Sequence, residues 1–264
     1  MTRRSSLLAS FNAAALASFL ILPVLGFAQA TPIKNVVLVH GAWADGSSYS
    51  KLIPLLEAQG LHVVAVQNPL TSFADDVAAT KRIIDAQDGP VLLVGHSYGG
   101  SIISEAGNNP KVVGLVYIAA FGPDTGETLI TTGKGFAATP AAAEIRQIED
   151  GFLVLTRKGV AEDFCQDLSE TEKSTMLAVQ GPTAASVFAA PITHAAWYEK
   201  PSWYVVAANE HTINPDYERF VPKRMGAKTL TVQASHVAML AKPKEIADVI
   251  VEAAASGAGS TARQ

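Results

Sequence analysis

The stretch Val91-Leu92-Leu93-Val94-Gly95-His96-Ser97-Tyr98-Gly99-Gly100 decides the fold of this chain. Its four apolar residues predict a strand buried on both faces, and a helix is expected from Tyr98 to Glu105. A strand, a sharp turn and a helix around G-x-S-x-G form the context that a nucleophile elbow requires. Such a turn leaves no room for side chains next to Ser97, which accounts for Gly95 and Gly99. We therefore predict that Ser97 is a nucleophile; the alternative is a serine that caps a helix.

Short apolar runs flank this stretch on both sides along the chain. Further strands are expected over 35–40, 62–67, 112–121, 202–208 and 228–233, and further helices over 48–59, 74–86, 216–225 and 243–254. Runs rich in Val, Ile and Leu without alternation indicate a parallel sheet covered by helices. The sequence thus predicts an α/β fold with a mostly parallel six-stranded sheet. Pro54 is expected to kink the helix over 48–59. Asp75 and Asp76 are expected on the polar side of the helix over 74–86.

The regular alternation fails between residues 122 and 201. Segments 141–148 and 161–168 are helix candidates there, but about eighty residues are too many for a loop in a compact domain. We therefore predict an inserted cap over 122–201, with the core formed by 31–121 and 202–264.

The first thirty residues are expected to be a signal peptide. A basic start at Arg3 and Arg4, an apolar stretch over 7–27 and the small-x-small end Ala28-Gln29-Ala30 have the composition of a cleavable export signal. The start also resembles a twin-arginine signal. The alternative is a membrane anchor. We expect an exported protein, periplasmic or secreted.

Composition limits the partners. Residues 31–264 carry 18 basic and 24 acidic side chains, a net charge of −6, so no nucleic-acid partner is expected. Cys165 is the only cysteine, and the six histidines lack the spacing of metal ligands. We expect no cofactor and no metal, and a small-molecule substrate. The oligomeric state stays open.

A serine nucleophile needs a histidine base and an acid, in the chain order serine, acid, histidine. His236 follows the last predicted strand and is the base that this order favours. Glu210 follows the strand over 202–208 and is the preferred acid, because a carboxylate there can orient the imidazole. Asp124, just past the preceding strand, is the rival acid.

The sequence around His40-Gly41-Ala42-Trp43 closes the first strand. In acyl transfer, N–H donors must be aimed at the developing oxyanion. We assign this role to the backbone N–H groups of Ala42 and Tyr98, and a structural role to His40. Residues of the predicted substrate pocket are Trp43, Phe121, His194 and Trp197.

By these motifs the chain resembles the α/β-hydrolase superfamily from about Pro32 to Ala253. The best match is the compact group of plant methylesterases, hydroxynitrile lyases and bacterial esterase relatives. It shares the His-Gly strand end, the Gly-His-Ser-Tyr-Gly-Gly elbow, an acid followed by x-Thr-Ile (210–213) and Ser-His at 235–236. The resemblance implies the same fold and a Ser-His-acid triad that works without a cofactor.

Two departures from that group affect the expected reaction. The group usually has Asp where this chain has Glu210, and its lyase members have a lysine where this chain has Val237. Hydrolysis of a small carboxylic ester is therefore favoured over cyanohydrin cleavage. Ser97 excludes the aspartate chemistry of haloalkane dehalogenases. The alternatives are another acyl transfer on the same triad and a ligand-binding relative without catalysis.

Overall fold

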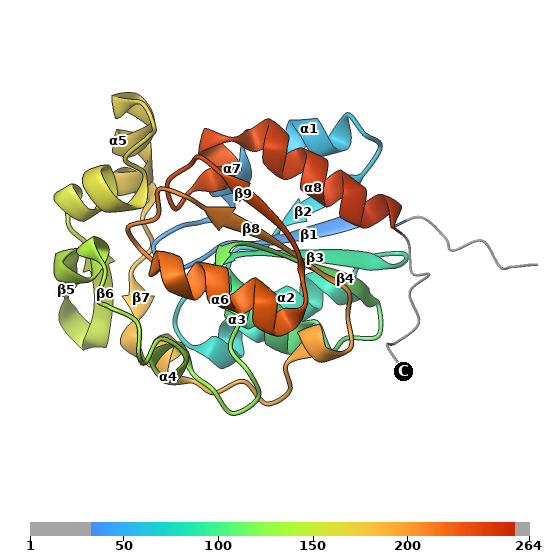
Figure 1. Ribbon diagram of the computed structural model, residues 1–264, viewed down its shortest axis with the longest axis horizontal. Helices are drawn as coiled ribbons and strands as arrows, with labels where there is room; N and C mark the ends of the chain where they lie inside the picture. Colours follow the sequence, from blue (N-terminus) through green and yellow to red (C-terminus); the bar gives the residue numbers. More distant parts are fainter. Residues whose placement is uncertain (1–32, 257–264) are drawn as a thin grey trace, which may run out of the picture.

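The computed structural model describes residues 33–256 and has a central six-stranded sheet of order β2-β1-β3-β4-β8-β9 (Figure 1). Every pair of neighbouring strands in it is parallel. The central strands β1 and β3 are buried at every position, as their unbroken apolar runs predicted. The strands are β1 (Asn35–Val39), β2 (His62–Ala65), β3 (Val91–Ser97), β4 (Val112–Ala120), β8 (Ser202–Ala207) and β9 (Lys228–Val232).

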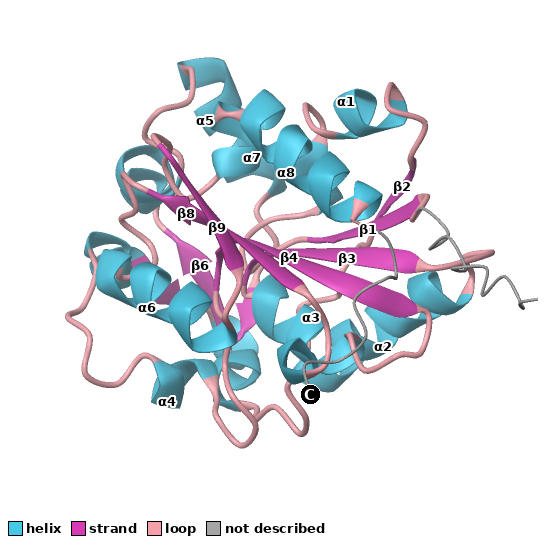
Figure 2. Ribbon diagram, turned by 45° about the vertical axis from the view of Figure 1, so that its right-hand side comes forward, coloured by secondary structure: helices cyan, strands magenta, loops and turns pink. Residues whose placement is uncertain are grey.

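Helices cover both faces of this sheet (Figure 2). One face carries α1 (Ile53–Glu57), α7 (Ala238–Ala241) and α8 (Pro243–Ala255). The other carries α2 (Phe73–Asp85), α3 (Gly99–Ala106) and α6 (Pro215–Met225). Both α2 and α6 begin at a side chain that accepts a hydrogen bond from the first turn, Ser72 and Asn214 respectively. The predicted fold class is confirmed.

Three expectations for these helices were wrong. The segment 48–59 forms a 3₁₀ turn (Gly46–Tyr49) followed by the short α1, not one helix. Pro54 lies in the first turn of α1, where a missing N–H removes no helical bond and causes no kink. In α2, Asp76 is fully buried and not on the solvent side, because it accepts hydrogen bonds from Leu70 and Tyr98.

The segment 122–201 forms a small sheet of its own beside the carboxyl ends of the core strands (Figure 1). Antiparallel strands β5 (Ile145–Gln147), β6 (Phe152–Leu155) and β7 (Thr183–Ala184) make up this sheet. The helices α4 (Leu129–Thr132) and α5 (Glu170–Val179) accompany it. The remaining helical turns span Pro140–Glu144, Glu149–Gly151, Gly159–Phe164, Ala185–Ala189 and Ala196–Tyr198.

The helix expected over 141–148 was wrong in its second half, which pairs with β6 as strand β5. The helix expected over 161–168 is instead a single π-helical turn, Gly159–Phe164. The predicted signal peptide, residues 1–30, lies outside the described residues. Between residues 33 and 256, no helix combines the length and apolarity needed to cross a bilayer.

Candidate active site

Ser97 lies at the end of β3 in a backbone conformation that side chains rarely adopt, with φ of +54°. The turn is tight on both sides. A Cβ atom on Gly95 would lie 2.6 Å from the carbonyl oxygen of Gly99, and one on Gly99 would lie 2.3 Å from that of Val39. Only glycine fits at either position. The elbow geometry expected around Ser97 is therefore present, and α3 begins directly behind it.

His236 and Glu210 form a buried pair. Nδ1 of His236 lies 2.7 Å from Oε2 of Glu210, and both side chains are inaccessible to solvent. Glu210 follows β8 and His236 follows β9, so two adjacent strands bring them together. Parallel strands end at one edge of a sheet, which is why residues 26 positions apart in sequence meet there.

The Glu210 carboxylate is held by its own loop as well. Its Oε1 accepts hydrogen bonds from the backbone N–H groups of Thr212, at 2.6 Å, and Ile213, at 3.1 Å. Burial opposes the charge, but the contact with His236 and the hydrogen bonds outweigh it and hold the pKa of Glu210 below its ordinary value. Glu210 is thus an ionised acceptor that fixes the proton of His236 on Nδ1.

The other ring nitrogen of His236, Nε2, is buried and has no hydrogen-bond partner among the described residues. The ring packs against the rings of both His96 and Phe164, with centroids at 4.6 and 4.9 Å. Nε2 of His96 lies 3.0 Å from the carbonyl oxygen of His236. Burial and the His236 ring hold the pKa of His96 well below its ordinary value, so His96 is neutral and can donate that hydrogen bond. Nε2 of His236 is left free to accept a proton.

The loop after β1 passes directly beside Ser97. A Cβ atom on Gly41 would lie 2.7 Å from Cβ of Ser97. The N–H of Trp43, two residues after Gly41, donates to Oγ1 of Thr183 at 3.1 Å. Ala42 therefore lies between a residue packed against Ser97 and one hydrogen-bonded to segment 122–201, and its role as an oxyanion donor stays a prediction. Tyr98, the second predicted donor, is the N-cap residue of α3.

His40 holds this loop in place, as expected. Its Nε2 accepts a hydrogen bond from the Asn68 N–H at 2.9 Å, so its proton is on Nδ1 and faces the carbonyl oxygen of Gly41 at 2.8 Å. The Asn68 side chain donates to the carbonyl oxygen of His40 at 3.0 Å. Burial lowers the pKa of His40, which keeps the ring neutral and this bonding pattern intact.

A cavity of about 380 Å³ opens in front of Ser97. Its walls are mostly aromatic and aliphatic, and none of the described residues that line it carries a charge. Two of the predicted pocket residues, Trp43 and Phe121, line it, as do the elbow and the predicted oxyanion residues. The lining consists of Ala42, Trp43, Ser97, Tyr98, Phe121, Leu129, Ile130, Thr139, Ala141, Ala142, Ile145, Phe188 and Thr212.

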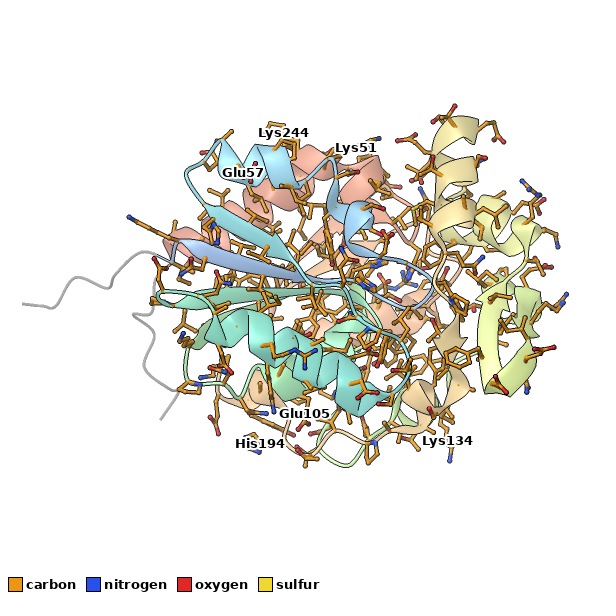
Figure 3. The ribbon with its side chains drawn as sticks, turned by 180° about the vertical axis from the view of Figure 1, so that it is seen from behind. Lys51, Glu57, Glu105, Lys134, His194 and Lys244 are labelled. Atoms are coloured by element: carbon orange, nitrogen blue, oxygen red, sulfur yellow. The ribbon has the colours of Figure 1, made fainter. Side chains whose placement is uncertain are left out.

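The other two predicted pocket residues, His194 and Trp197, do not line this cavity. His194 is exposed near Glu105, at the end of α3 away from Ser97 (Figure 3), and its Nε2 lies 3.1 Å from Glu199. Trp197 is buried, and its Nε1 donates to the carbonyl oxygen of Pro123 at 3.1 Å. Both belong to the part of segment 122–201 that packs against α3. The sequence pattern could not distinguish this part from the one that covers the elbow.

The rival acid, Asp124, is engaged elsewhere. Its carboxylate accepts hydrogen bonds from the hydroxyl of Tyr198 at 2.9 Å and from the N–H of Thr125 at 2.6 Å. The acid that contacts His236 is Glu210.

Glu218 on α6 is a further acid at the site, which the sequence analysis missed. It is fully buried, and ligand atoms of Glu210, Glu218 and His236 all lie within 4.8 Å of one another. Such a trio could in principle hold a metal ion, but Nδ1 of His236 is already bonded to Glu210. The sequence signal for Glu218 was its helical spacing, which places it on the buried face of α6 with Val221 and Met225.

Comparison with known proteins shows the family. The family described as "Alpha/beta hydrolase family" matches residues 36–249. Methylesterase 8 of Arabidopsis thaliana is 23% identical over 81% of this chain and 87% of its own length. A pyrethroid hydrolase of Sphingobium wenxiniae is 30% identical over 50% of this chain and 51% of its own length.

Among solved structures, a pyrethroid hydrolase from Sphingobium faniae JZ-2 superposes with a TM-score of 0.74 at 23% sequence identity. The superposition covers 84% of this chain and 97% of that one. The two chains share their fold over nearly the whole described length.

Proposed function

The chain belongs to the alpha/beta hydrolase family, and we propose that it is a serine-dependent hydrolase of carboxylic esters that acts through Ser97, His236 and Glu210. The observation that carries the proposal is the buried pair of His236 and Glu210, which contacts His96, the residue before the strained Ser97. A neutral imidazole whose Nδ1 proton is held by a carboxylate presents Nε2 as a base, which is the arrangement that activates a serine hydroxyl.

In the proposed reaction, Nε2 of His236 takes the hydroxyl proton of Ser97 as Oγ attacks the ester carbonyl carbon. The N–H groups of Ala42 and Tyr98 stabilise the oxyanion of the tetrahedral intermediate. The imidazolium then returns its proton to the departing alkoxide, which leaves as the alcohol. Water, deprotonated by His236 in turn, attacks the acyl-enzyme and releases the carboxylic acid. Glu210 stays ionised throughout and stabilises the imidazolium.

The cavity favours a neutral, apolar ester. A charged substrate would lose its hydration in a cavity whose lining offers no opposite charge, whereas apolar groups gain about 25 cal/mol for each Å² buried. One relative is named a methylesterase and another a pyrethroid hydrolase, which fits ester cleavage.

A second candidate is another acyl transfer or a lyase reaction on the same three residues. Val237, where the lyases that the sequence resembles have lysine, is fully buried. A lysine there would have to bury an ammonium group, so the lyase reaction has less support. A non-catalytic ligand-binding protein would have no use for the buried pair or the strained elbow.

The test is a rapid-mixing experiment with 4-nitrophenyl esters of acetate, butyrate and octanoate. An acylating hydrolase releases close to one equivalent of nitrophenol in a burst and then turns over steadily. A binding protein releases none. Charged analogues, such as the monoester of succinate, are expected to react at least about tenfold more slowly, because the carboxylate must be desolvated.

A further inference from the structure

Glu218 projects from α6 toward the acid of the proposed triad. Its side chain is fully buried, and one of its carboxyl oxygens lies within 4.8 Å of a carboxyl oxygen of Glu210. Two carboxyl groups in contact away from water are rare outside functional sites, because each ionised group opposes the other. The mechanism above uses only one of them.

The hydrogen bonds of the pair indicate where a proton is held. Glu210 already accepts three bonds, from Thr212, Ile213 and His236. Glu218 accepts one, from the Ala207 N–H to its Oε2 at 2.8 Å, and no N–H or O–H group on the described part of the chain donates to its Oε1. A proton on Oε1 of Glu218 would satisfy this buried atom, because it turns an unpartnered acceptor into a donor.

From this geometry we propose that Glu218 is a positioning residue: its protonated carboxyl group donates a hydrogen bond to Glu210 and keeps that carboxylate aimed at His236. The proposal rests on the proposed function only in so far as Glu210 is the triad acid. The bond places a single negative charge beside His236, shared between two side chains, in place of two charges that repel each other.

The groups around Glu218 support the protonated form. It faces Glu210 from the loop after β8, His236 from the loop after β9 and the phenol of Tyr204 on β8. The cation that opposes this effect is Arg219 on α6 itself, which is exposed and paired with Asp216 at 2.8 Å. Burial, and then the Glu210 charge, raise the pKa of Glu218 well above its ordinary value.

The geometry makes Glu218→Gln and Glu218→Leu discriminating variants. The amide of glutamine can donate to Glu210 with its N–H and accept from Ala207 with its oxygen, as the protonated acid does. Leucine fills a similar volume but can do neither. We expect kcat of Glu218→Gln within about threefold of wild type. Glu218→Leu should lose about tenfold to a hundredfold in kcat with little change in KM, the range for a lost hydrogen bond to a charged group. Asp216→Asn, an exposed change on the same helix, should leave both constants unchanged.

Infrared spectroscopy provides the readout that a merely structural role would not produce. At pH 8 the wild type should show the carbonyl stretch of a buried protonated carboxyl group, and Glu218→Gln should lack it. Asp76→Asn should retain it, which assigns the band, because Asp76 is another buried acid but has a pKa of about 6 and is ionised at pH 8.

Absence of the band in folded wild type overturns the proposal, as does a kcat for Glu218→Gln that falls as far as that of Glu218→Leu. The band does not depend on turnover. If no ester is cleaved but the band is present and assigned to Glu218, the proposed function fails while the carboxyl pair remains. If Glu218→Leu does not fold, the band and the glutamine variant still decide the question.

Discussion

Oε2 of Glu210 lies 2.7 Å from Nδ1 of His236, and neither side chain is reached by solvent. In the proposed reaction an ion pair forms here away from water, so solvent screens the attraction between the carboxylate and the imidazolium less than at the surface. Asp124 bonds to Tyr198 and Thr125 and makes no such contact. The choice between the two acids can therefore be tested directly.

Glu210→Gln should lower kcat by at least about a hundredfold, because the amide no longer selects the Nδ1 tautomer of His236 or stabilises its charged form; the same change in another triad cost about 10⁴-fold. Glu210→Asp should lose less, since the charge survives although the reach is shorter. Asp124→Asn should stay within about tenfold of wild type. Steady-state kinetics on one ester measure all three. The reverse ranking, with Asp124→Asn the most impaired, would move the acid to the end of β4.

The cavity lining predicts which of two adjacent alanines, Ala142 or Ala143, limits the size of the substrate. Ala142 lines the cavity and Ala143 does not, although both are exposed. Ala142→Trp should exclude about two methylene groups of a long acyl or alcohol chain. At about 0.8 kcal/mol per methylene, kcat/KM for octanoate should fall roughly tenfold, while acetate is hardly affected. Ala143→Trp is the matched control and should affect neither ester. Equal losses for acetate and octanoate in Ala142→Trp would contradict the assigned cavity.

Asp76 predicts a pH dependence of stability. Its carboxylate accepts bonds from the Tyr98 hydroxyl at 2.7 Å and the Leu70 N–H at 2.8 Å, and burial raises its pKa from 3.8 to about 6. The folded state thus holds this proton more tightly than the unfolded state. The stabilising contribution is complete below about pH 4 and decreases as the pH rises to about 6.

Asn at position 76 does not titrate. The free energy of unfolding of wild type, relative to that of Asp76→Asn, should therefore decrease between pH 4 and 6 and stay level above pH 7; urea titrations measure it. Asp75 is the control: it is exposed, and bonds from the Ser72 and Thr71 hydroxyls lower its pKa. Its contribution is lost only as the pH falls below about 4, so Asp75→Asn should show no change between pH 5 and 7. A flat difference for Asp76→Asn over pH 4–6 would mean that Asp76 is not protonated in the folded state.

The signal peptide stays a prediction, which we now extend to the mature protein. Cleavage after Ala30 would leave Thr31 as the first residue, two positions before the described structure begins. Mass spectrometry of protein recovered from the periplasm or medium of the native host measures the mature N-terminus. A form that starts at Met1 as the sole species would exclude export with cleavage.

The core could be predicted from the sequence because its signals are local. The runs 36–39 and 91–94 are buried on both faces, so their unbroken apolar character reports their place in the sheet. The elbow could be predicted for the same reason. The atoms that leave no room for a side chain at 95 and 99 belong to residues a few positions away or on the adjacent strand. The assignment of a triad to Ser97, Glu210 and His236 rested on their chain order and on their positions after successive predicted strands.

The internal structure of segment 122–201 could not be predicted in the same way. Its strands have three, four and two residues, too few for any periodicity to appear. Whether His194 or Phe188 reaches the cavity depends on how these short pieces turn over the core, which no local pattern encodes. Glu218 was missed because an acid in a helix is ordinarily solvated, and its contact with Glu210 is a product of the packing of α6 on β8.

Covalent labelling of Ser97 tests the central claim most directly. An alkyl fluorophosphonate reacts with a serine only when a base removes its proton and donors hold the phosphoryl oxygen. Intact-mass and peptide mass spectrometry should find one adduct per chain of folded wild type, on Ser97, with loss of all esterase activity. Ser97→Ala should take up no label and lose about 10⁶-fold in kcat, as when a triad serine is removed elsewhere. Labelling at another residue, or a Ser97→Ala protein that keeps a tenth of the wild-type activity, would contradict the account.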